Sequence, residues 1–72
     1  MSEKNLSVAA ATEAIEAAFD GRWGVWLSET GQWWATRIHQ LAARQLSAGC
    51  VPHVRADSPD ELTDCIRQQE SL

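Results

Sequence analysis

All four tryptophans of this 72-residue chain lie between Arg22 and Ile38, and this clustering constrains the fold more than any other feature. Two runs of strand-forming residues, 23–27 and 33–38, flank a short polar loop that ends in Gly31. A glycine that closes such a loop is typical of a β-hairpin. We expect a three-residue turn, 29–31, with Gly31 in the left-handed conformation that glycine adopts without steric cost.

This turn fixes which residues of the two strands lie opposite each other. The predicted pairs are Ser28 with Gln32, Leu27 with Trp33, Trp26 with Trp34, Val25 with Ala35, and Trp23 with Arg37. Opposite residues in an antiparallel pair point to the same face of the sheet. A slip of one residue or a bulge would exchange the two faces, so the face assignment depends on this turn.

The register predicts one apolar face and one mixed face for the hairpin. The apolar face, expected to form the core, carries Trp23, Val25, Leu27, Trp33 and Ala35. The mixed face carries Trp26, Ser28, Gln32, Trp34 and Thr36, with Arg22 beside the indoles. A buried face would not combine these residue types, so we predict an interaction site made of Arg22, Trp26, Trp34 and Thr36.

The segment before the hairpin is expected to consist of a short tail followed by a helix. Residues 1–6 are predicted as a disordered tail, and 7–72 as a single small domain. Residues 7–20 are alanine-rich and read as a helix, with Ser7 as N-cap, an end at Gly21 and an apolar stripe formed by Val8, Ala11, Ile15, Ala18 and Phe19. A core-facing role for this helix is favoured over a dedicated partner-binding role.

The second half of the chain adds a short helix, a strand and a final helix. Residues 39–47 suit a short helix that stops at Gly49, and 50–56 read as a third strand. Pro52 cannot donate a ladder hydrogen bond, so this strand is expected to lie at a sheet edge or to have its Pro52 amide position facing outward. The run 58–61, Ser-Pro-Asp-Glu, predicts a capped helix start, with Leu62 and Ile66 packing on the sheet.

These elements predict an α+β fold in the order α-β-β-(short α)-β-α, built on a three-stranded antiparallel sheet. A crossover through the short helix would place the third strand beside the first, which gives the strand order 2-1-3. One face would carry the helices and the other would stay partly open. The expected core consists of Phe19, Trp23, Val25, Leu27, Trp33, Leu62 and Ile66.

The residues that could carry chemistry do not form a recognisable set. Cys50 and His53 have the close spacing of a metal-ligand pair, but a regular strand would point them to opposite faces and no second pair exists. Cys50 and Cys65 are expected as reduced thiols rather than a disulfide. We expect no metal, no cofactor and no enzymatic activity, and the lack of a leader or an apolar run of spanning length favours a cytoplasmic protein without membrane contact.

Three alternatives remain for the mixed face. Indoles beside arginine form the anchor of many protein interfaces, and they also stack on bases of single-stranded nucleic acid. A helix or a twin subunit would otherwise cover them. The net charge of −4 disfavours nucleic acid, so we predict that the mixed face binds a second copy of the chain or another protein.

The segments RWGVWLSETGQWWATR, LSAGC and RADSPDEL resemble a group of short uncharacterised actinobacterial proteins. The shared features are a Trp-x-x-Trp strand, an aromatic-Trp-Ala strand and an Asp-Ser-x-x-Glu-Leu helix start, which fall here on Trp23, Trp26, Trp33, Trp34, Ala35, Asp57, Ser58, Glu61 and Leu62. The resemblance implies a cytoplasmic accessory of a transcription regulator. The layout is also similar to HicB-type antitoxin domains, from which the chain departs in residues 39–48 and in having no appended DNA-binding segment.

Overall fold

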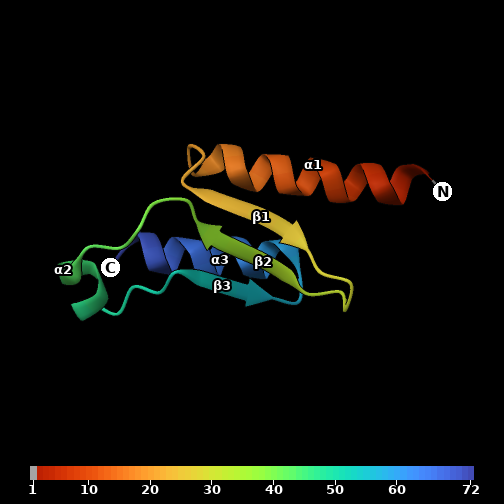
Figure 1. Ribbon diagram of the computed structural model, residues 1–72. Coiled ribbons are helices and arrows are strands. Elements are labelled where there is room, and N and C mark those ends of the chain that lie inside the picture. Colours follow the sequence, from red (N-terminus) through yellow and green to blue (C-terminus); the bar gives the residue numbers. More distant parts are fainter. Residues whose placement is uncertain (1) are drawn as a thin grey trace.

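The computed structural model describes the backbone of residues 2–72 and the side chains of residues 8–72. Over this range the chain forms three helices and one three-stranded antiparallel sheet (Figure 1). The elements are α1 (Ser2–Ala18), β1 (Trp23–Leu27), β2 (Trp33–Arg37), α2 (Ala43–Ser47), β3 (His53–Ala56) and α3 (Pro59–Glu70). The predicted α+β class and element order are confirmed.

The hairpin of β1 and β2 has the predicted register. Trp26 lies opposite Trp34, and every other predicted strand pair is also present. The turn is closed by hydrogen bonds from the Ser28 amide to the Gln32 carbonyl and from the Gly31 amide to the Ser28 carbonyl, 2.8 and 3.0 Å long. Gly31 has a φ of 84°, the left-handed conformation that the turn requires.

The predicted strand order was wrong, because β3 pairs with β2 and the order is β1-β2-β3. The outer edge of β1 is occupied by α1, which runs beside it (Figure 1). The Glu16 carboxylate of α1 accepts a 2.9 Å hydrogen bond from the Val25 amide of β1. A third strand at that edge would have to displace both the helix and this bond.

The helices differ from the prediction mainly at their ends. α1 begins at Ser2, before the predicted cap. Ser7 is the predicted N-cap, and its side chain lies outside the described residues. The first residue of the predicted tail, 1–6, also lies outside them. α2 is a single short helix, and the chain turns after it at Gly49, whose φ is 97°. Figure 1 shows that the connection carrying α2 extends beyond one end of the sheet.

α3 starts where the sequence predicts. Ser58 is the N-cap, and its hydroxyl accepts a 3.2 Å hydrogen bond from the Glu61 amide. The Glu61 carboxylate accepts from the Asp57 amide at 3.4 Å rather than from the Ser58 amide. The cap therefore forms half of a capping box, and Pro59 occupies the first helical position, where its missing N–H costs no hydrogen bond.

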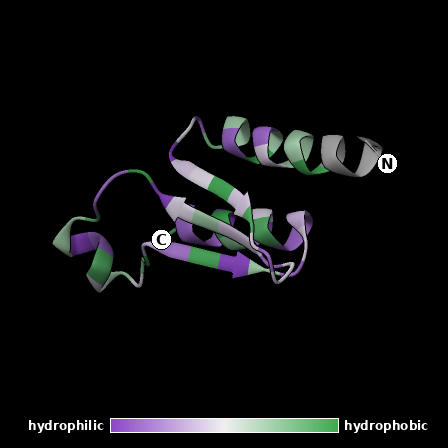
Figure 2. Ribbon diagram, turned by 45° about the vertical axis from the view of Figure 1, so that its right-hand side comes forward, coloured by the Kyte–Doolittle hydropathy of each residue, from purple (hydrophilic) through white to green (hydrophobic). Residues whose placement is uncertain are grey.

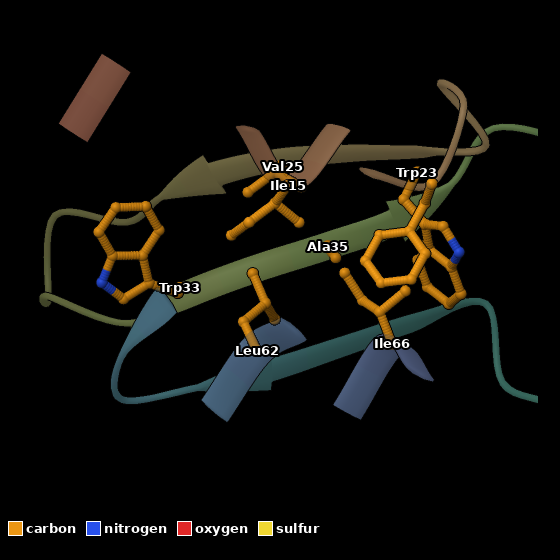
Figure 3. Packing of buried hydrophobic residues seen from close by; sticks show 8 residues of the cluster. Ile15, Trp23, Val25, Trp33, Ala35, Leu62 and Ile66 are labelled. Atoms are coloured by element: carbon orange, nitrogen blue, oxygen red, sulfur yellow. The ribbon is translucent and has the colours of Figure 1, made fainter. Parts of the chain in front are cut away.

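α1 and α3 pack side by side on one face of the sheet, where they enclose the core (Figure 3). In Figure 3, Ile15 points from α1 toward Val25, and Leu62 and Ile66 point from α3 toward Ala35. The buried cluster consists of Ile15, Phe19, Trp23, Val25, Trp33, Ala35, Leu62 and Ile66. Leu27, predicted in the core, is only partly buried at the hairpin end.

One end of this core is closed by polar side chains. Glu70, near the end of α3, accepts hydrogen bonds from the Trp23 indole N–H at 3.0 Å and from the Arg22 guanidinium. The Arg37 guanidinium lies 4.4 Å from the centre of the Trp23 ring and donates to the Gln69 side chain at 3.2 Å. Two of the chain's arginines thus stabilise the packing of α3 on the sheet.

Candidate functional site

The face of the sheet opposite α1 and α3 is covered by no helix in the described part of the chain. We name it the open face. The ladder register and the alternation of side chains assign it Gly24, Trp26, Ser28, Gln32, Trp34, Thr36, His53 and Arg55. Figure 2 shows the alternation of hydrophilic and hydrophobic residues along β3.

A stacked pair of indoles occupies the centre of the open face. The ring centroids of Trp26 and Trp34 are 6.0 Å apart and the ring planes differ by 7°. The Trp26 side chain is 45% exposed, whereas Trp23 on the other face of the same strand is 1% exposed. A large aromatic group held rigid by stacking and left in contact with water is a candidate anchor for a binding partner.

β3 adds a basic flank to the indole pair. Arg55 lies directly opposite Trp34, and its guanidinium carbon is 5.7 Å from the centre of that ring. The same guanidinium donates a 3.4 Å hydrogen bond to the Gln32 side chain. The His53 imidazole lies 6.0 Å from the Trp34 ring at a tilt of 59°. Trp26, Trp34 and Arg55 therefore form one continuous row across the three strands.

The open face holds no carboxylate among its assigned residues, although the chain as a whole carries a net charge of −4. Glu29, in the turn, and Asp57, just after β3, flank it at the hairpin end. The other acidic side chains of residues 8–72 belong to the helices and their flanks. The uneven charge distribution thus leaves this face neutral to weakly positive.

Arg22 does not lie beside the indole pair, so that part of the predicted site was wrong. Its guanidinium is engaged by Glu70 and Asp20 at the far end of the hairpin. The hydrogen bond to Glu70 is the main cause that raises the pKa of Arg22 above its ordinary value. Thr36 does lie on the open face, opposite both Gly24 and His53.

Arg55 and His53 take the place that the sequence interpretation gave to Arg22. Both belong to the third strand, which the predicted order 2-1-3 placed beside β1 instead of β2. The signal was present in the sequence, because these two residues alternate with Val54 and Ala56 and so share one face. The correct strand order would have placed Arg55 opposite Trp34.

Other parts of the described chain offer less for binding or catalysis. A surface hollow of about 440 Å³ lies at the α2 connection, and the side chains that line it include Ile38, Leu46 and His39 but no thiol or carboxylate. Cys50 is buried and Cys65 partly buried, both as free thiols. Over the described residues, no group of three or more His, Cys, Asp or Glu side chains is arranged to hold a metal ion.

None of the helices within residues 2–72 combines the length and the apolar character that a bilayer span requires. Comparisons of this chain with protein-family models, with curated proteins and with solved structures gave no match.

Proposed function

We propose that this protein is a non-enzymatic interaction module that binds a protein partner through the open face. The observation that carries the proposal is the exposed Trp26, stacked on the partly buried Trp34, on a sheet face that the described helices leave uncovered. Tryptophan and arginine are the residues most enriched among those that dominate protein interfaces, and both are present here in one row.

The geometry favours a partner that brings apolar groups and carboxylates together. The indole pair offers a flat apolar surface, and Arg55 borders it on the β3 side. An arginine that stacks near an aromatic ring is already positioned for a carboxylate, so little side-chain freedom is lost on binding. A carboxylate next to an aliphatic or aromatic side chain would match both features.

The test compares capture of proteins from a cell extract by the wild type, Trp26→Ala and Leu46→Ala. Leu46 is the matched control, because it is 56% exposed and lies on α2, away from the open face. We expect Trp26→Ala to lose the partners that the wild type and Leu46→Ala retain. Equal capture by all three proteins would contradict the proposal.

A second copy of the chain is one form of this partner. Light scattering over a range of protein concentrations measures the mass directly, and Trp26→Ala should then abolish any dimer. A strict monomer at all concentrations would leave a different protein as the partner. The resemblance described above adds a transcription regulator as that partner and a cytoplasmic setting, in which Cys50 and Cys65 would stay reduced.

Single-stranded nucleic acid is the second candidate, and the position of Arg55 over Trp34 is the observation that favours it. Bases stack on exposed aromatic rings and phosphates pair with nearby cations. With one arginine on the face, the logarithm of the affinity should fall with the logarithm of salt concentration with a slope of only about −0.7. Tryptophan fluorescence during titration with an oligonucleotide measures it.

A further inference from the structure

The outer edge of β3 carries backbone groups that the sheet does not use. The Arg37 amide donates a 2.8 Å hydrogen bond to the Pro52 carbonyl, which shows that position 52 faces β2. Backbone groups alternate in direction along an antiparallel strand, so Val54 and Ala56 also face β2. The N–H and C=O groups of His53 and Arg55 therefore point outward, and both residues are exposed.

Side chains of α3 close this edge at both ends but not in the middle. The Val51 amide donates to the Gln69 side chain at 2.8 Å, and the Asp57 amide donates to the Glu61 carboxylate at 3.4 Å. Among the described residues, no side chain is hydrogen-bonded to the outward amide of His53 or Arg55. The open segment thus spans two consecutive outward-facing residues, framed by two capped amides.

The opposite edge of the sheet is closed. The outward amide of Val25, in the middle of β1, is bonded to Glu16, and α1 runs along that strand. An added strand at β1 would have to remove a helix, whereas one centred on His53 and Arg55 would meet solvent in the middle of the β3 edge and only the Gln69 and Glu61 side chains at its ends. Of the two edges, only β3 has the geometry for strand addition.

We propose that an extended acidic segment of the protein partner adds to β3 as a fourth strand of the sheet. This inference rests on the proposed function and specifies how the partner binds. The outward groups of His53 and Arg55 would exchange backbone hydrogen bonds with the segment. Its alternate side chains would extend the open face beyond Arg55, next to the row that contains Trp26 and Trp34.

Charge complementarity identifies the segment as acidic. A residue placed opposite Arg55 by strand addition points to the same face as Arg55, and an opposite-charge pair in that position is stabilising. His53 lies on the same face, and its imidazole offers an N–H donor to a carboxylate. Glutamate or aspartate at alternate positions of the segment would meet both side chains.

The same charges disfavour a second copy at this edge. Two β3 strands paired around Val54 would place His53 of each copy opposite Arg55 of the other. A pairing shifted to put Arg55 opposite Arg55 would set like charges against each other, which is destabilising. Neither arrangement gives Arg55 a carboxylate, as an acidic segment does.

The experiment is an NMR titration of the full-length, ¹⁵N-labelled protein with two synthetic peptides. In one peptide threonine alternates with glutamate, and in the other threonine alternates with lysine. We expect the acidic peptide to slow hydrogen exchange at the amides of His53 and Arg55, while the amide of Val25 is unaffected. The basic peptide should bind about fivefold more weakly, as expected from one cross-strand charge pair.

Two charge-reversal variants complete the test. Arg55→Glu should invert the preference and bind the basic peptide more tightly. Arg44→Glu is the control, because it changes the net charge equally at an exposed position on α2 and should keep the wild-type preference. Equal binding of both peptides, or no slowing at His53 and Arg55 at millimolar peptide, would overturn the inference.

Three further results separate this inference from the proposed function. Slow exchange at the β3 edge without peptide, increasing with protein concentration, means that a second copy occupies the edge and overturns the assignment to an acidic partner. Loss of capture by Trp26→Ala, with capture by Arg55→Glu unchanged, overturns strand addition but supports the open face as a binding surface. If the acidic peptide slows hydrogen exchange at His53 and Arg55 but Trp26→Ala captures partners normally, the result supports strand addition and contradicts the proposed function.

Discussion

The hairpin contains two pairs of tryptophans. Each pair has one residue on β1 and one on β2, but the two pairs lie in different environments. Trp23 and Trp33 are 1% and 8% exposed beneath α1 and α3, whereas Trp26 is 45% exposed and stacks on Trp34 across the strands. Only the parity of their positions separates them. Register, rather than hydrophobicity, thus determines which indoles stabilise the fold and which remain available for binding.

Trp23 of the buried pair also has a hydrogen-bond acceptor, which neither indole of the exposed pair has among the described residues. The Trp23 indole N–H is satisfied by Glu70, and its ring contacts the Arg37 guanidinium. A buried indole N–H without an acceptor would cost free energy, so Glu70 allows Trp23 to be fully enclosed. Trp26 reaches solvent, and it needs no such acceptor from the protein.

The largest expected difference between the two pairs is in folding stability. Trp23→Ala should lower the free energy of unfolding by roughly 3 to 5 kcal/mol, because it leaves a cavity under α3 and removes the indole N–H that donates to Glu70. Urea denaturation measures the loss. If this variant does not fold, Trp23→Phe should fold with reduced stability. A loss smaller than that of Trp26→Ala would mean that the two faces are assigned the wrong way round.

Local features of the sequence predicted much of the fold because they are determined by short-range interactions. Gly31 fixes the turn, the turn fixes the register, and the register separates the core-facing from the open indoles. Ser58 and Pro59 likewise define the start of α3 through a single turn of helix. Each of these predictions needs only residues that are close in the chain.

The strand order and the composition of the site depend on contacts between distant residues, which the pattern does not contain. The hydrogen bond that the Val25 amide donates to the Glu16 carboxylate closes the β1 edge and leaves β2 as the neighbour of β3. The pairing of Arg22 with Glu70 spans most of the chain and removes Arg22 from the candidate site. Neither contact follows from periodicity or local propensity.

The second largest loss of stability is expected from a change in α3, which covers the core face of the sheet and not the open face. Ser58→Ala should cost about 1 kcal/mol, because the Glu61 amide loses its acceptor at the start of α3. Thermal unfolding measures the loss, and Ser47→Ala, at the end of α2, is the control. In fluorescence quenching by acrylamide, any added exposure should come from Trp23 and Trp33. An unchanged melting temperature would show that the Ser58 cap contributes little.

A third variant removes the exposed pair. Trp26→Ala should cost only about 1 kcal/mol, the contribution of one aromatic pair in which Trp26 stays 45% exposed. The variant should keep the circular dichroism spectrum of the wild type while losing partner capture. A loss of stability close to that of Trp23→Ala would show that the open face is needed for folding, and the comparison of the two pairs would fail.

The smallest expected effect comes from Glu70, the carboxylate that accepts a hydrogen bond from the buried Trp23 indole. The hydrogen bond from Arg22 is the main cause that lowers the pKa of Glu70, and the Trp23 indole N–H lowers it further. The folded state therefore binds fewer protons at Glu70 than the unfolded state. Its contribution to stability is present above the ordinary glutamate pKa of about 4.3 and is lost as the pH falls through the lower, folded-state pKa.

Glu70→Gln should remove this part of the acid sensitivity, so the difference in melting temperature between wild type and variant should shrink as the pH is lowered. The difference will be small at any pH, because the Arg22 side chain is 47% exposed and solvent screens the pair. The indole N–H resonance of Trp23 should shift as Glu70 titrates, while those of Trp26 and Trp34 should not follow this titration. Equal shifts at all three indoles would show that the carboxylate does not act on the buried pair alone.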